Sequence, residues 1–368
     1  MTPDSGMTVL HLIPSLVGGG AERQLALLAP AMSKMGVRVH VACLHGGVNA
    51  APLMDAGVPF HRVPAAGNHD PRVVLTLCRL IRKIQPDLVQ TWLTQMDVMG
   101  AMAARIMGVP HILSERSSAS MYPRNWKNRI RLQVGRRADV VVANSVAGRD
   151  YWRDAGRRGP CRVIRNAVPV NEIAGTPAAD PAELGLAREA RLIVFAGRFS
   201  SEKGPLVAVD AATLALEGRS DLAAAFFGNG PMEGAMRDRA GPSLARGSMC
   251  FPGYAADFWR WLRAACVLIA PSEVEGHPNV VLEAAAAGVP LVLSDIPAHR
   301  ELFDEQAAVF CQPHDAAAFG RAIHTVVDRP AEAADRVEAA RGRTAALSVE
   351  SAALGYLAIY REIIAKPG

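Results

Sequence analysis

The chain has 368 residues, of which half are hydrophobic and a fifth are charged, so it is long enough for two globular domains and too apolar to be disordered. Its six cysteines are scattered without a CxxC pair, which predicts small core residues in a reducing compartment. No apolar run reaches the roughly 18 residues that span a bilayer. The first segment lacks the basic start of a signal peptide and is expected to be a strand, so we expect a cytoplasmic protein.

The two halves of the chain differ in charge. Residues 1–180 contain 22 Lys and Arg against 12 Asp and Glu, whereas residues 181–368 contain 18 against 23. A net charge of +10 followed by −5 suggests two domains with different partners. The densest basic stretch is YPRNWKNRIRLQVGRR (Tyr122–Arg137), which has six basic residues, no acid and one tryptophan.

Short β-branched runs alternate with helical stretches along the chain. Each run has about four to eight apolar residues, as parallel strands do when both faces are covered. Stretches between them, such as AERQLALLAPAMSKMG and PRVVLTLCRLIRKIQ, predict helices. The predicted strands are residues 8–14, 37–44, 58–64, 86–92, 109–115 and 138–145 in the first half, and 191–197, 222–228, 248–253, 266–272, 289–294 and 307–311 in the second.

This alternation predicts an α/β protein with two doubly wound, Rossmann-like domains that face each other across a cleft. A Pro- and Ala-rich stretch separates them, so we expect an N-terminal domain over residues 1–175 and a C-terminal domain over residues 176–350. The last helix, residues 351–368, could belong to either domain and is a candidate to cross back to the first. Ligands of such sheets bind at the carboxyl ends of the strands, near helix N-termini.

Three glycines, Gly18, Gly19 and Gly20, follow the first predicted strand and precede a helix. Their spacing is not GxGxxG, and the second strand ends without the acidic residue that a nicotinamide ribose needs. A dinucleotide fingerprint is therefore excluded. The glycines instead predict a mobile loop at a helix N-terminus that lines the ligand site.

Two loops of the second half suit a phosphorylated ligand. In AGRFSSEKG, a strand ends at Gly197, and Arg198 and Lys203 follow before the next helix. Two such cations can neutralise a diphosphate and stabilise it as a leaving group. In GNGP (residues 228–231), glycines would let the backbone approach a base or sugar closely. The alternative for AGRFSSEKG is a solvated loop, and the alternative for GNGP is an ordinary turn.

The stretch EGHPNVVLEAAAAGVP (residues 275–290) predicts a buried helix that starts with Asn279 as a polar cap and closes at Gly288. Glu283 lies one turn inside, where a buried carboxylate needs a partner. The helix start suits a phosphate, Glu283 suits vicinal hydroxyls such as those of a ribose, and Glu275 lies further along the same ligand. The alternative is a solvated Glu275 and a Glu283 that pairs with an arginine.

Taken in order, GGAER, RNAVP, GRFSSEKG, GNGP and EGHPNVVLEAAAAGVP resemble family 4 of the retaining glycosyltransferases, of GT-B fold, over nearly the whole chain. The most specific element is the pair Glu275 and Glu283. The resemblance implies that Glu283 binds the nucleotide ribose and that Glu275 contacts hydroxyls of the donor sugar. It further implies that Arg198 and Lys203 hold the diphosphate. The other implied donor-binding residues are Gly18, Gly19, Gly20, Gly197, Asn229, Gly276, Asn279 and Val280.

One departure from the family concerns a histidine that members often carry after the strand that here reads VPHILSE. The sequence continues there with Glu115 and Arg116, while His111 lies within the strand and is expected in the core. The resemblance carries the position, but not the histidine's role, over to Glu115 and Arg116. Together with Glu275, Arg198 and Lys203, they are the candidate catalytic residues.

The resemblance also implies the reaction. A retaining enzyme of this kind needs no metal, and no cofactor is expected beyond its substrate, a nucleoside-diphosphate sugar that is expected to be UDP-linked. The acceptor would be a glycan or a polyprenyl-diphosphate-linked saccharide in the synthesis of cell-surface polysaccharide. Two alternatives stay open: a non-catalytic nucleotide-sugar-binding subunit, and a sugar-nucleotide epimerase of the same architecture.

The basic stretch Tyr122–Arg137 suits the anionic inner leaflet of the plasma membrane, which predicts a peripheral protein. Leu132 and Val134 leave its apolar face thin, so electrostatics would supply most of the affinity. The charges expected to act together are those of Arg129, Arg131, Arg136 and Arg137. The alternative is a solvated helix face. No nucleic-acid recognition module is present, so nucleic-acid binding is not expected.

Overall fold

The computed structural model describes residues 6–67, 70–117, 122 and 125–365, and the chain divides into two compact units. Unit 1 comprises residues 1–167 and 347–368, and unit 2 comprises residues 168–346. The division lies before residue 175, where the boundary was expected, because α7 (Val170–Gly175) packs on α11 (Asn279–Ala287). The chain therefore leaves unit 1, forms unit 2 and returns to unit 1.

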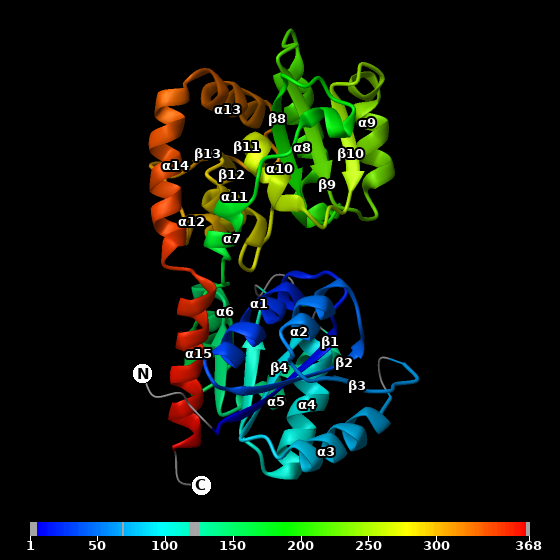
Figure 1. Cartoon of the computed structure of the whole chain (residues 1–368), viewed down its shortest axis with the longest axis vertical. Helices are drawn as coiled ribbons and strands as arrows, with labels where there is room; N and C mark the ends of the chain where they lie inside the picture. Colours follow the sequence, from blue (N-terminus) through cyan, green and yellow to red (C-terminus); the bar gives the residue numbers. More distant parts are fainter. Residues whose placement is uncertain (1–5, 68–69, 118–121, 123–124, 366–368) are drawn as a thin grey trace. The chain divides into compact units, whose positions relative to one another are not determined.

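Unit 1 is built on a seven-stranded sheet with the order β3-β2-β1-β4-β5-β6-β7 (Figure 1). Its strands are β1 (Thr8–Ser15), β2 (Arg38–His45), β3 (Phe60–Arg62), β4 (Leu88–Trp92), β5 (His111–Glu115), β6 (Val140–Ala143) and β7 (Cys161–Val163). Its helices include α1 (Gly20–Lys34), α2 (Ala51–Asp55), α3 (Arg72–Ile84), α4 (Leu93–Met107), α5 (Trp126–Arg136), α6 (Val146–Asp154) and α15 (Val349–Ile364). The strands pair in parallel, as predicted. The sequence did not predict β7, because the run CRV is short and charged.

Helices cover both faces of the sheet in unit 1, and β1 shows how. Val9 and Ile13 point to the core under α1 and α15, while Leu10 and Leu12 point to the core under α3 and α4. Alternate side chains of one strand thus face two different helical layers, which is why the strand reads as a continuous apolar run.

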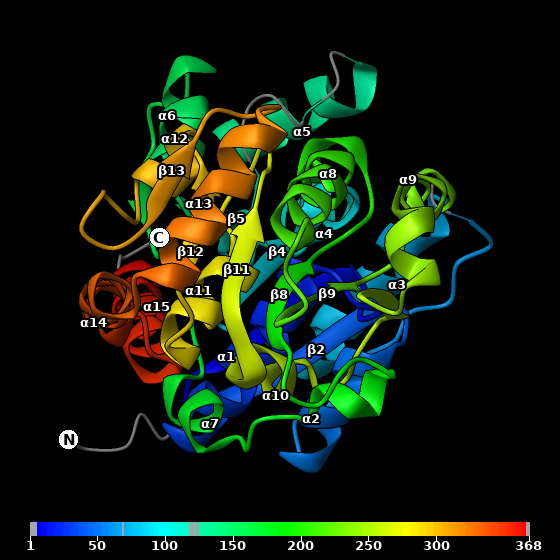
Figure 2. The ribbon, with the colours of Figure 1, turned by 90° about the horizontal axis from the view of Figure 1, so that it is seen from above.

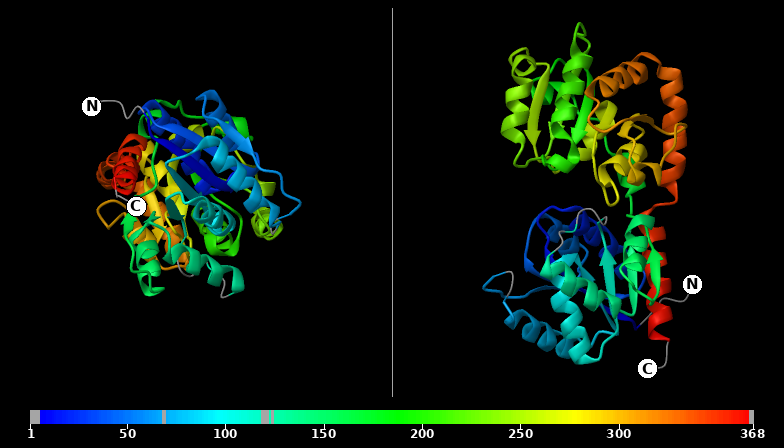
Figure 3. Two further views of the ribbon diagram at one scale, coloured as in Figure 1. Left: turned by 90° about the horizontal axis from the view of Figure 1, so that it is seen from below. Right: turned by 180° about the vertical axis from the view of Figure 1, so that it is seen from behind.

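The last helix belongs to unit 1. It packs along α1, and the aromatic side chains of Tyr356 and Tyr360 are at most 1% exposed. From behind, α15 (red) runs beside the β7 edge (Figure 3), where Arg162 forms an ion pair with Glu362. Residues from the far end of the sequence therefore complete the core around β1.

Unit 2 is built on a six-stranded parallel sheet with the order β10-β9-β8-β11-β12-β13. Its strands are β8 (Arg191–Ala196), β9 (Leu222–Phe227), β10 (Met249–Gly253), β11 (Ala265–Ala270), β12 (Leu291–Ser294) and β13 (Val309–Cys311). Its further helices include α8 (Pro205–Leu216), α9 (Glu233–Ala245), α10 (Phe258–Ala264), α12 (Pro297–Arg300), α13 (Ala316–Asp328) and α14 (Pro330–Ala345).

Neighbouring residues of β9 show the two covered faces of this sheet. Phe226 packs into the core that contains α8 and α13, whereas Phe227 contacts Phe258 and Trp261 of α10. Figure 2 shows α8 between α9 and α13. The predicted pair of doubly wound α/β domains is confirmed. Within the described residues, none of the helices combines the length and the apolar character that crossing a bilayer requires.

Candidate functional site

The loops predicted to bind a donor follow three neighbouring strands of unit 2. β8 leads into Gly197 and the short 3-10 helix η4 (Ser201–Lys203), β9 leads into residues 228–231, and β11 leads into residues 271–278 before α11. Because β9, β8 and β11 are adjacent and parallel, their carboxyl ends lie at one edge of the sheet. The structure thus brings the three loops together.

The GNGP turn packs closely against the loop after β8. A Cβ atom on Gly228, whose φ is +130°, would lie 1.9 Å from the carbonyl oxygen of Gly197. The backbone N–H of Phe199 donates to the carbonyl of Asn229 at 2.9 Å. Only glycine fits at position 228, so the turn fixes the path of the loop that carries Arg198. The side chains of Arg198 and Asn229 are exposed there.

Lys203 is held by a second close backbone approach. Gly204 follows it with φ +62°, and a Cβ at this position would lie 2.2 Å from the carbonyl oxygen of Pro271. The backbone N–H of Glu273 donates to the carbonyl of Glu202 at 2.9 Å. These contacts join the loop after β8 to the loop after β11 and set the position of Lys203.

Lys203 and Glu275, both predicted site residues, form an ion pair. The Lys203 Nζ atom lies 2.6 Å from Glu275 Oε1, and the hydroxyl of Ser272 donates to the same oxygen at 2.9 Å. The side chains are 27% and 10% exposed, so the pair is partly reachable by solvent. It places one cation and one carboxylate at the edge of the sheet.

Helix α11 begins at Asn279, with Pro278 before it and no side-chain cap. Asn279 was expected to be the cap, so that prediction is corrected: Pro278 takes the flanking position, and Asn279 is the first helical residue. The first turn contains no acidic residue. Its N–H groups and the helix dipole therefore favour an anion. Gly276, Asn279 and Val280 are half-buried around this start.

Glu283 is buried, as predicted, with 4% of its surface exposed. The indole N–H of Trp259, on α10, donates to Glu283 Oε2 at 3.2 Å. The sequence gave no indication of this partner, because 24 residues and a strand separate the two positions.

A buried histidine near Glu275 was also missed. His299, on α12, lies with its Nδ1 atom 2.9 Å from the Ser294 carbonyl, and the hydroxyl of Ser294 donates to the carbonyl of Ser272. Burial lowers the pKa of His299, although Glu275 nearby opposes this shift. The sequence feature that could have pointed to His299 is its position shortly after a predicted strand, in the run SDIPAH.

In unit 1, Gly18 and Gly19 lie exposed between β1 and α1, and Gly20 opens the helix. A Cβ on Gly19 would lie 2.2 Å from the carboxylate of Glu22, which accepts a hydrogen bond from Ser15. An acidic side chain thus already occupies the first turn of α1, unlike that of α11.

Glu115 ends β5 and is fully buried. Its carboxylate accepts from Arg131 at 2.9 Å, from the indole of Trp152 at 2.9 Å and from the backbone N–H of Ser117 at 3.0 Å, and the hydroxyl of Tyr122 also donates to it. A carboxylate surrounded by these donors suits a positioning role, and a part for Glu115 in catalysis stays a prediction.

Arg131 lies between two carboxylates, those of Glu115 and Asp97, and its Nε atom is 2.7 Å from Asp97 Oδ2. Burial raises the pKa of Asp97 to about 6, against the opposing effect of Arg131. Since the Arg131 side chain is 1% exposed, the expectation that it meets a membrane surface is wrong. Arg129, Arg136 and Arg137 are exposed.

Arg116 turns away from Glu115. Its guanidinium lies 4.6 Å over the ring of Trp92, and its nitrogen atoms are buried without a well-formed hydrogen bond. It lies near Tyr356 of α15: burial raises the pKa of that phenol, and the guanidinium opposes the shift. His111 lies in the core, where its Nε2 atom contacts the Thr91 hydroxyl at 2.9 Å.

Two family models match the chain. The model described as Glycosyltransferase Family 4 matches residues 18–172, and the model described as Glycosyl transferases group 1 matches residues 190–329. The two matched ranges together include residues of both units, and both models describe glycosyltransferases. This agrees with the family suggested by the motifs and gives no support to an epimerase or a non-catalytic subunit.

Individual proteins give the same result. EpsF of Bacillus subtilis, which is named as a glycosyltransferase, is 26% identical over 78% of this chain and 79% of its own. The D-inositol 3-phosphate glycosyltransferase of an Arthrobacter species is 27% identical over 90% and 89%. Among solved structures, HepE of Anabaena in complex with UDP-glucose superimposes on this chain with a TM-score of 0.84 at 21% sequence identity. The superposition covers 97% of this chain and 100% of HepE.

Proposed function

The chain belongs to the group 1, family 4 retaining glycosyltransferases of GT-B fold, and we propose that its donor is a UDP-sugar held by unit 2. The observation that carries the proposal is the Lys203–Glu275 pair at the edge of the sheet. Glu275 lies in the loop that leads to α11, whose first turn contains no acidic residue. The solved complex of HepE with UDP-glucose supports UDP as the nucleotide.

We propose that the donor diphosphate lies between Lys203, Arg198 and the first turn of α11. All three are sources of positive potential, which is what a diphosphate requires as negative charge develops on it. They would supply the neutralisation that a divalent metal can otherwise provide, so we propose transfer without a metal. Activity in excess EDTA should equal activity without it.

Glu283 and Glu275 are proposed to accept hydrogen bonds from hydroxyl groups of the donor. The Glu283 carboxylate would accept hydrogen bonds from the ribose while keeping its contact with Trp259. In Glu275, both Lys203 and Ser272 contact Oε1, so Oε2 is the oxygen available to the sugar. Gly197, Asn229, Gly276, Asn279 and Val280 line the same edge and complete the proposed donor site of unit 2. That Gly18, Gly19 and Gly20 of unit 1 also bind the donor stays a prediction.

The proposed step retains the configuration of the transferred sugar. The bond from the anomeric carbon to the diphosphate oxygen breaks, and the acceptor oxygen bonds to that carbon on the same face. The acceptor proton passes to the departing phosphate oxygen. Lys203 and Arg198 stabilise the departing charge, so no protein nucleophile is needed.

Donor binding tests this proposal. UDP and UDP-sugars should raise the melting temperature of the full chain, because a ligand of the native state adds about 2.7 kcal/mol at a hundred times its Kd. Glu275→Gln should keep the Kd for UDP within about threefold while turnover falls at least tenfold, which is about 1.4 kcal/mol in the transition state. Equal stabilisation by every nucleotide, or by none, would contradict the donor assignment.

For the acceptor, we propose a lipid-linked saccharide in surface-glycan synthesis, met at the inner face of the plasma membrane. The support is α5, whose cations Lys127, Arg129 and Arg136 are exposed and followed by Arg137, with no acid in the helix. Basic residues near an anionic surface contribute about 1 kcal/mol each.

Vesicle binding tests the membrane contact. Neutralising Arg129, Arg136 and Arg137 together should weaken binding to phosphatidylglycerol vesicles at low salt, and wild-type binding should fall at high salt. The matched control neutralises Arg79, Arg82 and Lys83, three exposed charges on α3. If both triple variants bind alike, α5 is not the contact.

A further inference from the structure

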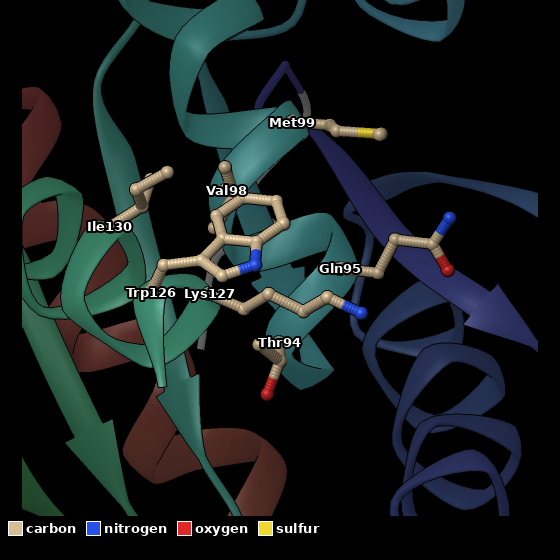
Figure 4. Close-up of a pocket in the computed structure, with 7 residues that line it drawn as sticks. All are labelled: Thr94, Gln95, Val98, Met99, Trp126, Lys127 and Ile130. Carbon is tan, nitrogen blue, oxygen red and sulfur yellow. The ribbon is translucent and has the colours of Figure 1, made fainter. Parts of the chain in front are cut away.

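The contact between α4 and α5 leaves an open cavity of about 370 Å³. Its apolar lining comes from Val98 and Met99 of α4 and from Trp126 and Ile130 of α5. Figure 4 shows the Trp126 indole and Val98 close together, with the Lys127 side chain extending past the indole. The cavity is thus an apolar slot with one cationic side chain along it.

The slot is rimmed by large apolar side chains that water reaches. Trp126 is 61% exposed and Ile130 is 39% exposed, and their spacing of four places them on one face of α5. From α4, Val98 and Met99 line the slot and are half-buried. Apolar surface gathered on two packed helices is typical of a site that binds an apolar partner.

The charges around the slot identify the chemistry of that partner. Asp97 is the acidic residue of α4, and it is fully buried against Arg131, while α5 has no acid. Lys127 lines the slot and is exposed, and Arg129 is exposed two residues further along α5. An apolar slot with a cationic rim fits an amphiphile that carries an anionic head next to its hydrocarbon chain.

We propose that this slot binds the isoprenoid chain of a polyisoprenyl-phosphate-linked acceptor; the inference rests on the lipid-linked acceptor proposed above. One slot between two helices takes one chain, which fits a single-chain isoprenyl phosphate and not a two-chain phospholipid. Trp126, Ile130 and Val98 contact the chain, and Lys127 contacts the phosphate. This goes beyond surface adsorption, because a single lipid molecule is held in a cavity.

Calorimetric titration with farnesyl phosphate, below the concentration at which it forms micelles, tests the slot. The full chain should bind farnesyl phosphate and not inorganic phosphate. Ile130→Glu should weaken this binding at least tenfold, because it places a carboxylate in the slot, and Lys127→Gln should weaken it severalfold. The matched control is Leu75→Glu on α3, an apolar residue that is 57% exposed outside the slot, and its Kd should not change.

Two further readouts separate this inference from the proposed function. UDP binding, measured on the same samples, should be equal in wild type and Ile130→Glu, which also shows that the variant is folded. Absence of farnesyl phosphate binding, or equal binding by Ile130→Glu, would overturn the slot even where UDP binds normally. Tighter binding of dodecyl phosphate would overturn the isoprenoid assignment. Binding of farnesyl phosphate by a chain that binds neither UDP nor a UDP-sugar would support the slot and contradict the proposed donor.

Discussion

The two units share one architecture but differ in how deeply they bury the charged residues near their strand ends. In unit 1, Arg131 lies between Asp97 and Glu115 beside the end of β5, and none of the three side chains is more than 1% exposed. In unit 2, Lys203 and Glu275 pair between the ends of β8 and β11 with 27% and 10% of their side chains exposed. The first group is closed to ligands, whereas the second is partly open.

This difference separates charges that organise the fold from charges that can act on a substrate. A buried ion pair leaves uncompensated charge when one partner is removed, so its loss is measured in stability. A partly exposed pair can exchange one partner for a ligand at a smaller cost in stability, so its loss is measured in affinity. The predictions below test this separation.

The largest effect is expected for Arg131→Met. The variant leaves Asp97 and Glu115 buried without their cation, which costs about 3–5 kcal/mol in the unfolding free energy of unit 1. Urea unfolding followed by tryptophan fluorescence measures it. Arg129→Met, on the exposed side of the same helix, is the control and should stay within about 0.5 kcal/mol of wild type. A loss below about 1 kcal/mol in Arg131→Met would show that the buried group contributes little.

For Lys203→Met, the expected loss is in donor affinity. Removing a charge-assisted contact with the diphosphate costs about 1.5–3 kcal/mol, or about ten- to a hundredfold in the Kd for UDP. Titration calorimetry measures it, with Glu273→Gln as the control because Glu273 is exposed two residues from Glu275. A large fall in melting temperature with an unchanged Kd for UDP would contradict the comparison, because it would give the Lys203–Glu275 pair a role in stability and none in binding.

The third prediction concerns His11, which is buried in unit 1 and accepts from the indole of Trp92 at 3.1 Å. Burial lowers its pKa from 6.5 to about 3. Its contribution to stability is present above pH 6.5 and is lost as the pH falls toward 3, by about 1.4 kcal/mol per pH unit. In His11→Asn, which keeps an acceptor for Trp92, the stability of unit 1 should fall less steeply between pH 6.5 and 4.5. Parallel pH profiles would contradict the assignment.

The smallest effect is expected for Trp259→Phe, which removes the indole N–H that meets Glu283. Loss of this hydrogen bond should cost unit 2 about 1 kcal/mol. The Kd for UDP should stay within about threefold, because the carboxylate that accepts from the ribose is kept. Glu283→Ala is the comparison, and it should weaken UDP binding at least tenfold. Equal affinities in the two variants would remove Glu283 from the proposed donor site.

The sequence predicted most strands of this fold because they are apolar on both faces. Val9 and Leu10 point to different helical layers, so β1 needs apolar side chains on both faces, which made the strand easy to recognise. The strand β7 was missed, since an edge strand of three residues does not need that pattern. The place of α15 was left open, because a helix with apolar residues fits either unit until its contacts are known.

The candidate site was predictable where its residues are close in sequence. The loops with Lys203 and Glu275 follow predicted strands, so their meeting at one edge follows from parallel topology. Partners supplied by other elements were not predictable. Arg131 was assigned to a membrane surface on its charge, whereas the carboxylates that bury it come from α4 and β5. A pattern along the chain shows which residue types are present and not which of them meet.

The return of the chain to unit 1 sets an order of events during synthesis. Residues 168–346 of unit 2 are contiguous, so they can fold as soon as they leave the ribosome. The core of unit 1 contains Tyr356, Leu357 and Tyr360 of α15, which emerge only after all of unit 2. Until then, the apolar side chains of α1 that pack against α15 lack that helix. The part of the protein translated first is therefore the last to be completed, and a nascent chain from which all of unit 2 but not yet α15 has left the ribosome would carry a folded unit 2 and an unfinished unit 1.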